Sequence, residues 1–440
     1  YMFSFKEIFT SRTTLVAMLI MLFPLFINTL RHWASSIYIL VFLLSVTAVR
    51  QYRFDLKKEE KIFLAILLLH VLTVVASNIL AGWTYASNRW FFAGEVRLLL
   101  AIPVYLYIRQ IPGIWRWLLR GIPLGAIIIG LTGIIDFAMR YYKGDVGMIF
   151  AEGIYGHIFQ GNIAALLSVL SFLAIDYFKD NKLFMRLCIA GAMLAFLGAL
   201  VSVTRNAWLS LIVLYAATFI ISNSTSSYLA TLKLKHYLTA LVILLPVLYF
   251  LANIEYVKDR FERIVEEPVV YFNIDRSQPI PFTSIGFRLE QWRGVLLAVQ
   301  EKPLLGHGVG NMGRLQNDYV EQGKLNQLVY MDHTEKTGRP THVHSAYFEY
   351  LGDTGVIGFT LTLLMLFYPM YAALKKRKQS NVAWRFVFIH YFAFAVASLT
   401  EVPFIRNNWT SVFLIFAMVF FAWLVSESAD EEKRIQLDAN

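Results

Sequence analysis

The sequence predicts an all-α polytopic membrane protein with about twelve membrane-spanning helices and one large, partly helical loop. Of its 440 residues, 57% are hydrophobic and only 16% are charged, whereas soluble proteins carry about 25% charged residues. The apolar residues form continuous runs that are long enough to cross a bilayer as helices. They do not alternate with polar residues at a period of two, which excludes an outer-membrane β-barrel.

Twelve apolar runs are interpreted as spans, because hydrocarbon offers no partner for a free backbone N–H or C=O and therefore requires helices. The tenth run, 345–374, is expected to form a short helix, a break and then a span. The runs lie near residues 13–30, 33–49, 62–82, 91–108, 121–139, 160–177, 184–203, 206–222, 237–253, 345–374, 382–400 and 409–426.

Lysine and arginine gather in alternate connections between these spans. The basic connections lie at 50–61, 109–120, 179–186, 233–235 and 375–378. Such connections face the cytoplasm in membrane proteins, so both termini are expected there. The formal net charge of +10 is therefore attributed to membrane topology, and no nucleic-acid partner is expected.

One connection, residues 254–344, is far longer than the others and lies on the extracytoplasmic side in this topology. A loop of this length usually has a function or a structure of its own. Helices are expected at its start (254–267) and at 287–300, where apolar residues recur at helical spacing. The expected organisation is spans one to nine in 1–253, the loop with active-site residues in 254–344, three spans in 345–426 and a cytoplasmic tail in 427–440.

Charged residues occur inside or at the edges of several spans, where they are costly and usually functional. Nearly all of them fall at the predicted extracytoplasmic ends, so we expect a shared cavity on that side. They are Glu95, Arg97, Asp136, Arg205, Glu349, Asp353 and Glu401.

Two arginines are candidates for binding a phosphate or diphosphate. Arg205 lies in a tight turn between spans seven and eight, and Arg288 lies at the start of the second loop helix. A guanidinium is always charged and offers its donors in a rigid fork. An arginine that extends to lipid headgroups is the alternative for Arg205. Arg293 lies five positions after Arg288, and its favoured interpretation is a residue on a solvated helix face.

A glycine-rich segment, Gly306–Asn311, could let backbone N–H groups approach an anion. No Lys-Ser/Thr pair follows it, so it is not a P-loop. A flexible turn is the other interpretation.

Two histidines, His342 and His344, precede the tenth span, followed by Glu349 and Asp353. A histidine here suits a general base, and a structural histidine at the helix start is the alternative. On a helix, residues two apart would point in different directions. Zinc would need more ligands, and nothing in the sequence places His307 or His333 nearby.

Several of these short motifs, in this order, resemble the bacterial O-antigen ligase family. They are Thr204–Trp208, Gly286–Leu289, Gly306–Asn311 and the segment from His342-Val343-His344-Ser345 to Gly358. The resemblance is good from about residue 200 to 360 and covers only general topology elsewhere. The family often has Asn where this chain has Ser345.

The resemblance implies a glycosyltransferase-C-like enzyme of the bacterial inner membrane with a periplasmic active site. It would move O-antigen from undecaprenyl diphosphate to a sugar hydroxyl of lipid A–core, with inversion and with no metal or other cofactor. Arg205 and Arg288 would bind the donor diphosphate, and His344 would act on the acceptor hydroxyl. His342, Arg293, Glu349, Asp353 and Arg97 are possible supporting residues.

Three alternatives remain open at this stage. An O-antigen polymerase would use the same donor, but no arginine of the long loop has the glycine eleven positions on that some polymerases repeat. A protein O-oligosaccharyltransferase usually carries more C-terminal periplasmic sequence than the short polar tail seen here. A transporter or lipid-linked sugar flippase tends to place its polar residues near the bilayer midplane instead of at one face.

Overall fold

The computed structural model describes residues 12–144, 150–223, 249–273, 280–330, 342–378 and 382–438, together with Leu245. Every regular element in these ranges is helical. The elements are α2 (Arg12–Leu22), η1 (Phe23–Phe26), α3 (Trp33–Val46), η2 (Val49–Gln51), α4 (Lys58–Leu80), α5 (Tyr85–Trp90), η3 (Phe91–Glu95), α6 (Val96–Ile108), α7 (Ile114–Tyr142), α8 (His157–Tyr177), α9 (Lys182–Leu200), α10 (Arg205–Asn223), α12 (Glu255–Asn273), α13 (Ser284–Glu301), α14 (Met312–Glu321), η5 (Gln327–Val329), α15 (Ala346–Lys375), α16 (Ala383–Ala397), η6 (Pro403–Ile405) and α17 (Asn407–Asp438).

The multi-pass membrane architecture is confirmed. Eight helices in the described ranges are long and apolar enough to cross a membrane, and three shorter apolar helices cover 12–26, 33–46 and 383–397. These helices coincide with eleven of the predicted spans. The remaining span, 237–253, lies largely outside the described residues, so the count of twelve stays a prediction.

The predicted break in the tenth span is also confirmed. Gly355 interrupts α15 with φ 64° and ψ −165°, a backbone conformation that essentially only glycine adopts. The freed N–H of Val356 donates to the carbonyl of Pro303 at 2.8 Å. The break therefore ties the end of the long loop to the membrane-spanning bundle.

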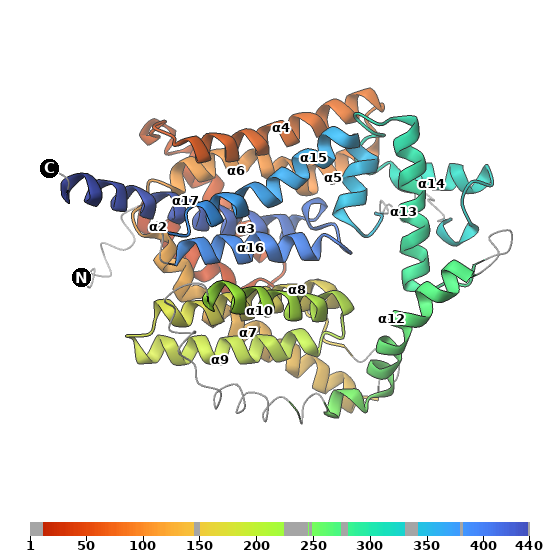
Figure 1. The fold of residues 1–440 in the computed structure, drawn as a ribbon, viewed down its shortest axis with the longest axis horizontal. Coiled ribbons are helices and arrows are strands. Elements are labelled where there is room, and N and C mark those ends of the chain that lie inside the picture. Colours follow the sequence, from red (N-terminus) through yellow and green to blue (C-terminus); the bar gives the residue numbers. More distant parts are fainter. Residues whose placement is uncertain are drawn as a thin grey trace.

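The loop helices α12, α13 and α14 lie across one end of the bundle, and α2 begins and α17 ends at the opposite end (Figure 1). The two helices expected in the loop are present as α12 and α13. The polar helix α14 was not predicted, because its sequence has no apolar run. The start of α2 and the end of α17 thus lie on the same side of the bundle, opposite the loop helices, as the predicted even number of spans requires.

Two helices form the centre of the bundle. About nine-tenths of the residues in the most apolar stretch of each helix are buried, 94% in α17 and 89% in α8. This burial is expected for helices that are apolar all round. α10 packs against α8 and α16. The start of α10, with Arg205, is therefore held at the loop end of a closely packed core.

Candidate active site

A large cavity lies where α8, α10, α12 and α13 meet the segment that follows α16. Its volume is about 670 Å³, within the usual range for a small-molecule site. Four charged side chains line it, those of Arg205, Arg260, Arg288 and Glu401. Apolar side chains such as Ile212 of α10 line it as well. The cavity can therefore take a ligand with an anionic group and an apolar chain.

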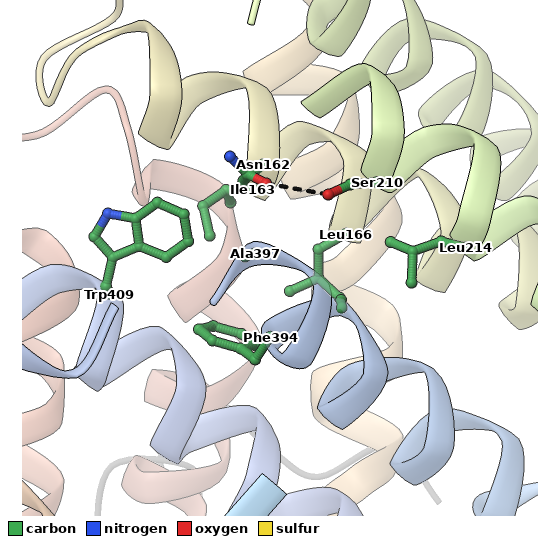
Figure 2. Close-up of a pocket in the computed structure, with 9 residues that line it drawn as sticks. Asn162, Ile163, Leu166, Ser210, Leu214, Phe394, Ala397 and Trp409 are labelled. Atoms are coloured by element: carbon green, nitrogen blue, oxygen red, sulfur yellow. Dashed lines mark hydrogen bonds between the residues drawn. The ribbon is translucent and has the colours of Figure 1, made fainter. Parts of the chain in front are cut away.

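A second cavity, between α8, α10, α16 and α17, is too small for any substrate. Its volume is about 10 Å³, roughly the space of one water molecule. Figure 2 shows Ser210 and Asn162 on its wall, where the Ser210 hydroxyl donates to Asn162 Oδ1 at 3.2 Å. This contact, and that of the Asn206 amide with the Ala397 carbonyl at 3.3 Å, join α10 to its neighbours and fix the helix that carries Arg205.

Arg205 is the first residue of α10 and forms an ion pair across the cavity wall. Its Nη2 lies 3.0 Å from Oε1 of Glu267 and its Nη1 lies 3.5 Å from Oε2. Glu267, on α12, is buried. The preceding turn is strained, because Val203 has φ 49°, a rare conformation for a β-branched residue. Arg205 is thus held by a packed, strained turn on one side and by a carboxylate on the other.

Glu267 also positions the helix that carries Arg288. Its Oε2 accepts the backbone N–H of Ile285 at 2.7 Å, and the Thr283 hydroxyl caps the same helix end by accepting the N–H of Gly286 at 3.0 Å. Burial opposes ionisation, but the hydrogen bonds from Arg205 and Ile285 outweigh it and lower the pKa of Glu267. This single carboxylate therefore sets the positions of both predicted arginines.

Arg288 lines the cavity, and its guanidinium forms no hydrogen bond or ion pair with any described residue. Burial lowers its pKa, while the carboxylate of Glu401 acts in the opposite direction. A third arginine, Arg260 of α12, also lines the cavity and donates through Nη2 to the Tyr256 hydroxyl at 2.7 Å. An unpaired, half-buried guanidinium next to two others suits an anion with more than one charge.

The two histidines lie side by side, and the divergence expected of residues two apart on a helix does not apply to them. Their ring centroids are 4.3 Å apart, because residues 342–345 are not helical and His344 has φ 53°. Glu401, which lines the cavity, lies 4.0 Å from Nδ1 of His344. Burial alone would raise the pKa of Glu401, but His344, Arg406 and His342 outweigh it and lower that pKa to about 2. An ionised carboxylate therefore faces the His344 ring.

His342 differs from His344 in its partners. Nη2 of Arg406 donates to Nε2 of His342 at 3.2 Å, so that nitrogen carries no proton. Burial, His344 and Arg406 lower the pKa of His342 to about 3. His342 is thus a neutral acceptor for Arg406 and a poor base, whereas His344 keeps a ring nitrogen for another partner.

His342, His344 and Glu401 are also possible metal ligands. One atom from each lies within 4.8 Å of the other two, an arrangement that the sequence spacing did not suggest. Arg406 already places a cation there, since its guanidinium bonds His342 and lies 3.9 Å from Glu401 Oε2. A divalent ion would have to displace it. His333, considered from the sequence, lies outside the described residues, and Nε2 of His307 contacts the Ala298 carbonyl at 2.9 Å.

Glu349 and the loop helix α13 hold the histidine segment in place. The buried Glu349 accepts the N–H of Val343 at 2.6 Å. The indole of Trp292 donates to the Val343 carbonyl at 2.9 Å, and the amide of Gln291 donates to the His342 carbonyl at 3.3 Å. Glu349 therefore supports the site through the backbone and does not line the cavity.

The segment Gly306–Asn311 forms a turn that docks on Asp353 of α15. The contacts of this turn decide between the two interpretations of the glycine-rich motif. The N–H of Val309 donates to Asn78 Oδ1 at 2.7 Å, and that of Gly310 donates to Asp353 Oδ2 at 3.3 Å. The N–H of Gly308 donates to the Asp353 carbonyl at 2.8 Å. Because protein groups use these amides, the turn attaches the loop to α4 and α15 and does not offer an anion cradle.

Two of the predicted supporting residues have structural partners away from the cavity. Arg97 is buried and donates through Nη1 to the carbonyl of Ala93 at 2.5 Å and to Asn407 Oδ1 at 3.2 Å, which ties η3 to the start of α17. Arg293 pairs with Glu290 at 3.1 Å. Asp136, noted from its place in a span, pairs with Arg140 at 3.1 Å.

The comparisons with known proteins concern the family that the chain resembles. The family model described as O-antigen ligase matches residues 190–363, a range that includes Arg205, Arg288 and His344. The resemblance expected from the sequence is thereby confirmed. A Haemophilus influenzae protein with the name "Uncharacterized protein" is 23% identical over 333 residues, which are 74% of this chain and 77% of that protein.

Proposed function

We propose that this multi-pass membrane protein, which matches the O-antigen ligase family over residues 190–363, transfers O-antigen from undecaprenyl diphosphate to lipid A–core. The reaction would take place in the periplasmic leaflet of the bacterial inner membrane, on a glycosyltransferase-C-like fold. The loop 254–344 would be periplasmic, and both chain ends cytoplasmic. The family match supports a role in O-antigen ligation or polymerisation, and the choice of donor and acceptor is part of the proposal.

One observation carries the proposal: Arg288, which has no hydrogen-bond or ion-pair partner among the described residues, lines a cavity together with Arg205, which pairs with Glu267, and with Glu401. A diphosphate bound between the two arginines would receive charge-assisted hydrogen bonds from both. Its polyprenyl chain would follow apolar side chains of the lining, past Leu209 and Ile212 of α10. Both of these residues line the cavity and are exposed on the bundle surface.

The proposed reaction is a single displacement. His344 takes the proton of an acceptor sugar hydroxyl, and the oxygen forms a bond to the anomeric carbon of the donor sugar. The bond from that carbon to the diphosphate oxygen breaks, and the leaving diphosphate keeps the electron pair. Arg205 and Arg288 stabilise its charge. Attack from the side opposite the leaving group inverts the anomeric configuration.

The roles of the neighbouring groups follow from their partners. Glu401 would orient the His344 ring and stabilise its protonated form, as a carboxylate does for a catalytic histidine. Arg406 and His342 would hold Glu401 and His344 in place. Two fixed arginines can provide the charge stabilisation for which other enzymes use a divalent ion, and Arg406 already supplies a cation beside His342 and Glu401. The proposed reaction is therefore metal-independent.

The decisive experiment is complementation of a strain that lacks its O-antigen ligase, with His344→Ala as the matched control. The proposal expects the wild-type chain to restore polysaccharide-capped lipopolysaccharide on a gel and the variant not to do so. Longer polyprenyl-linked chains without capping would instead identify a polymerase. Movement of lipid-linked glycan across vesicles without any transfer would identify a flippase.

A further inference from the structure

The loop helix α12 has one apolar face whose large side chains stay largely exposed in the described part of the chain. Each residue advances an α-helix by about 100°, which places five large apolar side chains within an arc of about 140°. All five are between 40% and 70% exposed. We call them the α12 apolar arc: Phe261, Ile264, Val265, Val269 and Phe272.

The opposite side of α12 is charged. It carries Asp259, Arg263 and Glu266, with Arg263 and Asp259 paired at 2.8 Å. Lys258 and Glu262, paired at 3.7 Å, lie at the Val269 edge of the arc. A contiguous exposed apolar surface indicates an interaction site. α12 is not among the helices suited to span a membrane, and a strongly two-faced helix of this kind typically lies in the plane of the membrane surface.

Exposed aromatic side chains mark the level of the membrane surface beside α12. Tyr142, which ends α7, is 92% exposed, and Tyr249 and Phe250, which closely precede α12, are exposed as well. The ring centroids of Tyr141 and Phe250 are 5.6 Å apart, so the end of α7 and the approach to α12 lie at one level. Tyrosine is enriched at the membrane–water interface. α12 therefore begins where the bundle leaves the hydrocarbon.

The α12 apolar arc is continuous with the lipid-facing surface of α10. The Phe261 ring stacks on Trp208 of α10 at 4.5 Å with an interplanar angle of 11°. Phe261 and Ile264 line the large cavity together with Leu209 and Ile212. In Figure 1, α12 runs across the end of the bundle, at a steep angle to its helices. An apolar surface that starts on a membrane-spanning helix and turns along the membrane plane fits acyl chains.

We infer that α12 is an in-plane membrane helix whose apolar arc is inserted among the acyl chains of the leaflet on the loop side. Its charged side then faces the headgroups and water. Phe261 and Ile264 belong to both the arc and the cavity wall, so the cavity opens to that leaflet between α10 and α12. This inference concerns the resting protein and does not depend on the transfer reaction.

The test uses spin labels on both faces of α12 in the full chain. The single natural cysteine, Cys188, is replaced by alanine. Cysteines are placed at Val265 and Val269 on the arc, and at Arg263 and Glu266 on the charged side as matched controls. Each labelled protein is reconstituted in phosphatidylethanolamine–phosphatidylglycerol vesicles. Collision rates are measured with oxygen, which concentrates in hydrocarbon, and with a water-soluble nickel chelate.

The arc labels should collide several-fold more often with oxygen than with the chelate, and the two control labels should show the reverse ratio. Equal access of the chelate to all four labels would overturn the inference, because the arc would then face water. Arc labels protected from both reagents would overturn it too, because protein would then cover the arc. Phe272→Cys repeats the measurement if an arc variant fails to fold. Since no transfer is measured, this result is independent of whether the proposed function is correct.

Discussion

Replacement of Arg288 by alanine should remove most of the transfer activity and leave the fold unchanged. The proposed diphosphate complex gives Arg288 two charge-assisted hydrogen bonds, each worth about 1.5–3 kcal/mol. Their loss amounts to roughly 3–6 kcal/mol, and each 1.4 kcal/mol is tenfold. We therefore expect kcat/KM for the donor to fall by about 10²–10⁴-fold. The midpoint of thermal unfolding should barely move, because Arg288 has no protein partner in the described structure that would be left unpaired.

The lysine variant separates charge from geometry. Arg288→Lys keeps the positive charge but cannot reproduce the planar fork, so it should rescue poorly. Arg293→Ala is the matched control, since Arg293 lies on the same helix, is absent from the cavity lining and pairs with Glu290. Initial rates with purified protein and lipid-linked donor give kcat and KM for all four proteins. Near-normal transfer by Arg288→Lys would refute bidentate binding, and a loss below tenfold in Arg288→Ala would refute the donor role.

Four further results are expected. Arg205→Ala should lose both activity and thermal stability, because it leaves Glu267 buried without its cation; adding Glu267→Gln should restore stability but not transfer, and restored transfer would contradict a donor role for Arg205. His344→Ala should lose transfer by about 10²–10⁴-fold and still bind donor, while His342→Ala should lose less transfer. If His344→Ala also loses donor binding, His344 is not the general base. Transfer should persist in EDTA, and a loss that Mg²⁺ or Mn²⁺ reverses would show that the cluster of His342, His344 and Glu401 holds a metal. In a cysteine-free background, a membrane-impermeant reagent applied to intact cells should label a cysteine at position 330 and not one at 378; labelling at 378 would invert the proposed topology.

The sequence was sufficient for the eleven spans that the structure describes, because continuous apolar runs depend only on local composition. It also located the two arginines, since an arginine at the end of a span or at the start of a docked helix is unusual by itself. Glu267 and Arg260 were not identified as site residues. Both lie on α12, whose charges alternate with apolar residues at helical spacing, and from sequence they cannot be distinguished from a solvated face. Only the packing of α12 against α13 and the start of α10 places Arg260 on the cavity wall and Glu267 against Arg205.

The histidine site could not be predicted as a cluster for a related reason. Glu401 was noted as a costly charge, but its contact with His344 depends on how the segment after α16 packs against the start of α15. The backbone N–H of Ala346 donates to the carbonyls of both Ser398 and Glu401, at 3.0 and 2.9 Å. Contacts of this kind bring together residues from separate helices. No spacing along the chain encodes them.

Backbone strain occurs at both groups of the proposed mechanism, the arginine that binds the diphosphate and the histidine that takes the proton. Three non-glycine residues in the described part of the chain have positive φ, and two of them are Val203 and His344. Such conformations cost of order 1–3 kcal/mol each and persist only where the surroundings over-determine them. Val203 is buried beneath the turn that presents Arg205, and His344 is fixed by the bonds that Glu349 and Trp292 make to Val343. A relaxed turn at either place would let the side chain leave its position. The packing around each turn therefore offsets the backbone strain and fixes the guanidinium of Arg205 and the imidazole of His344. Fixed groups of this kind can stabilise a transition state without reorganising during the reaction.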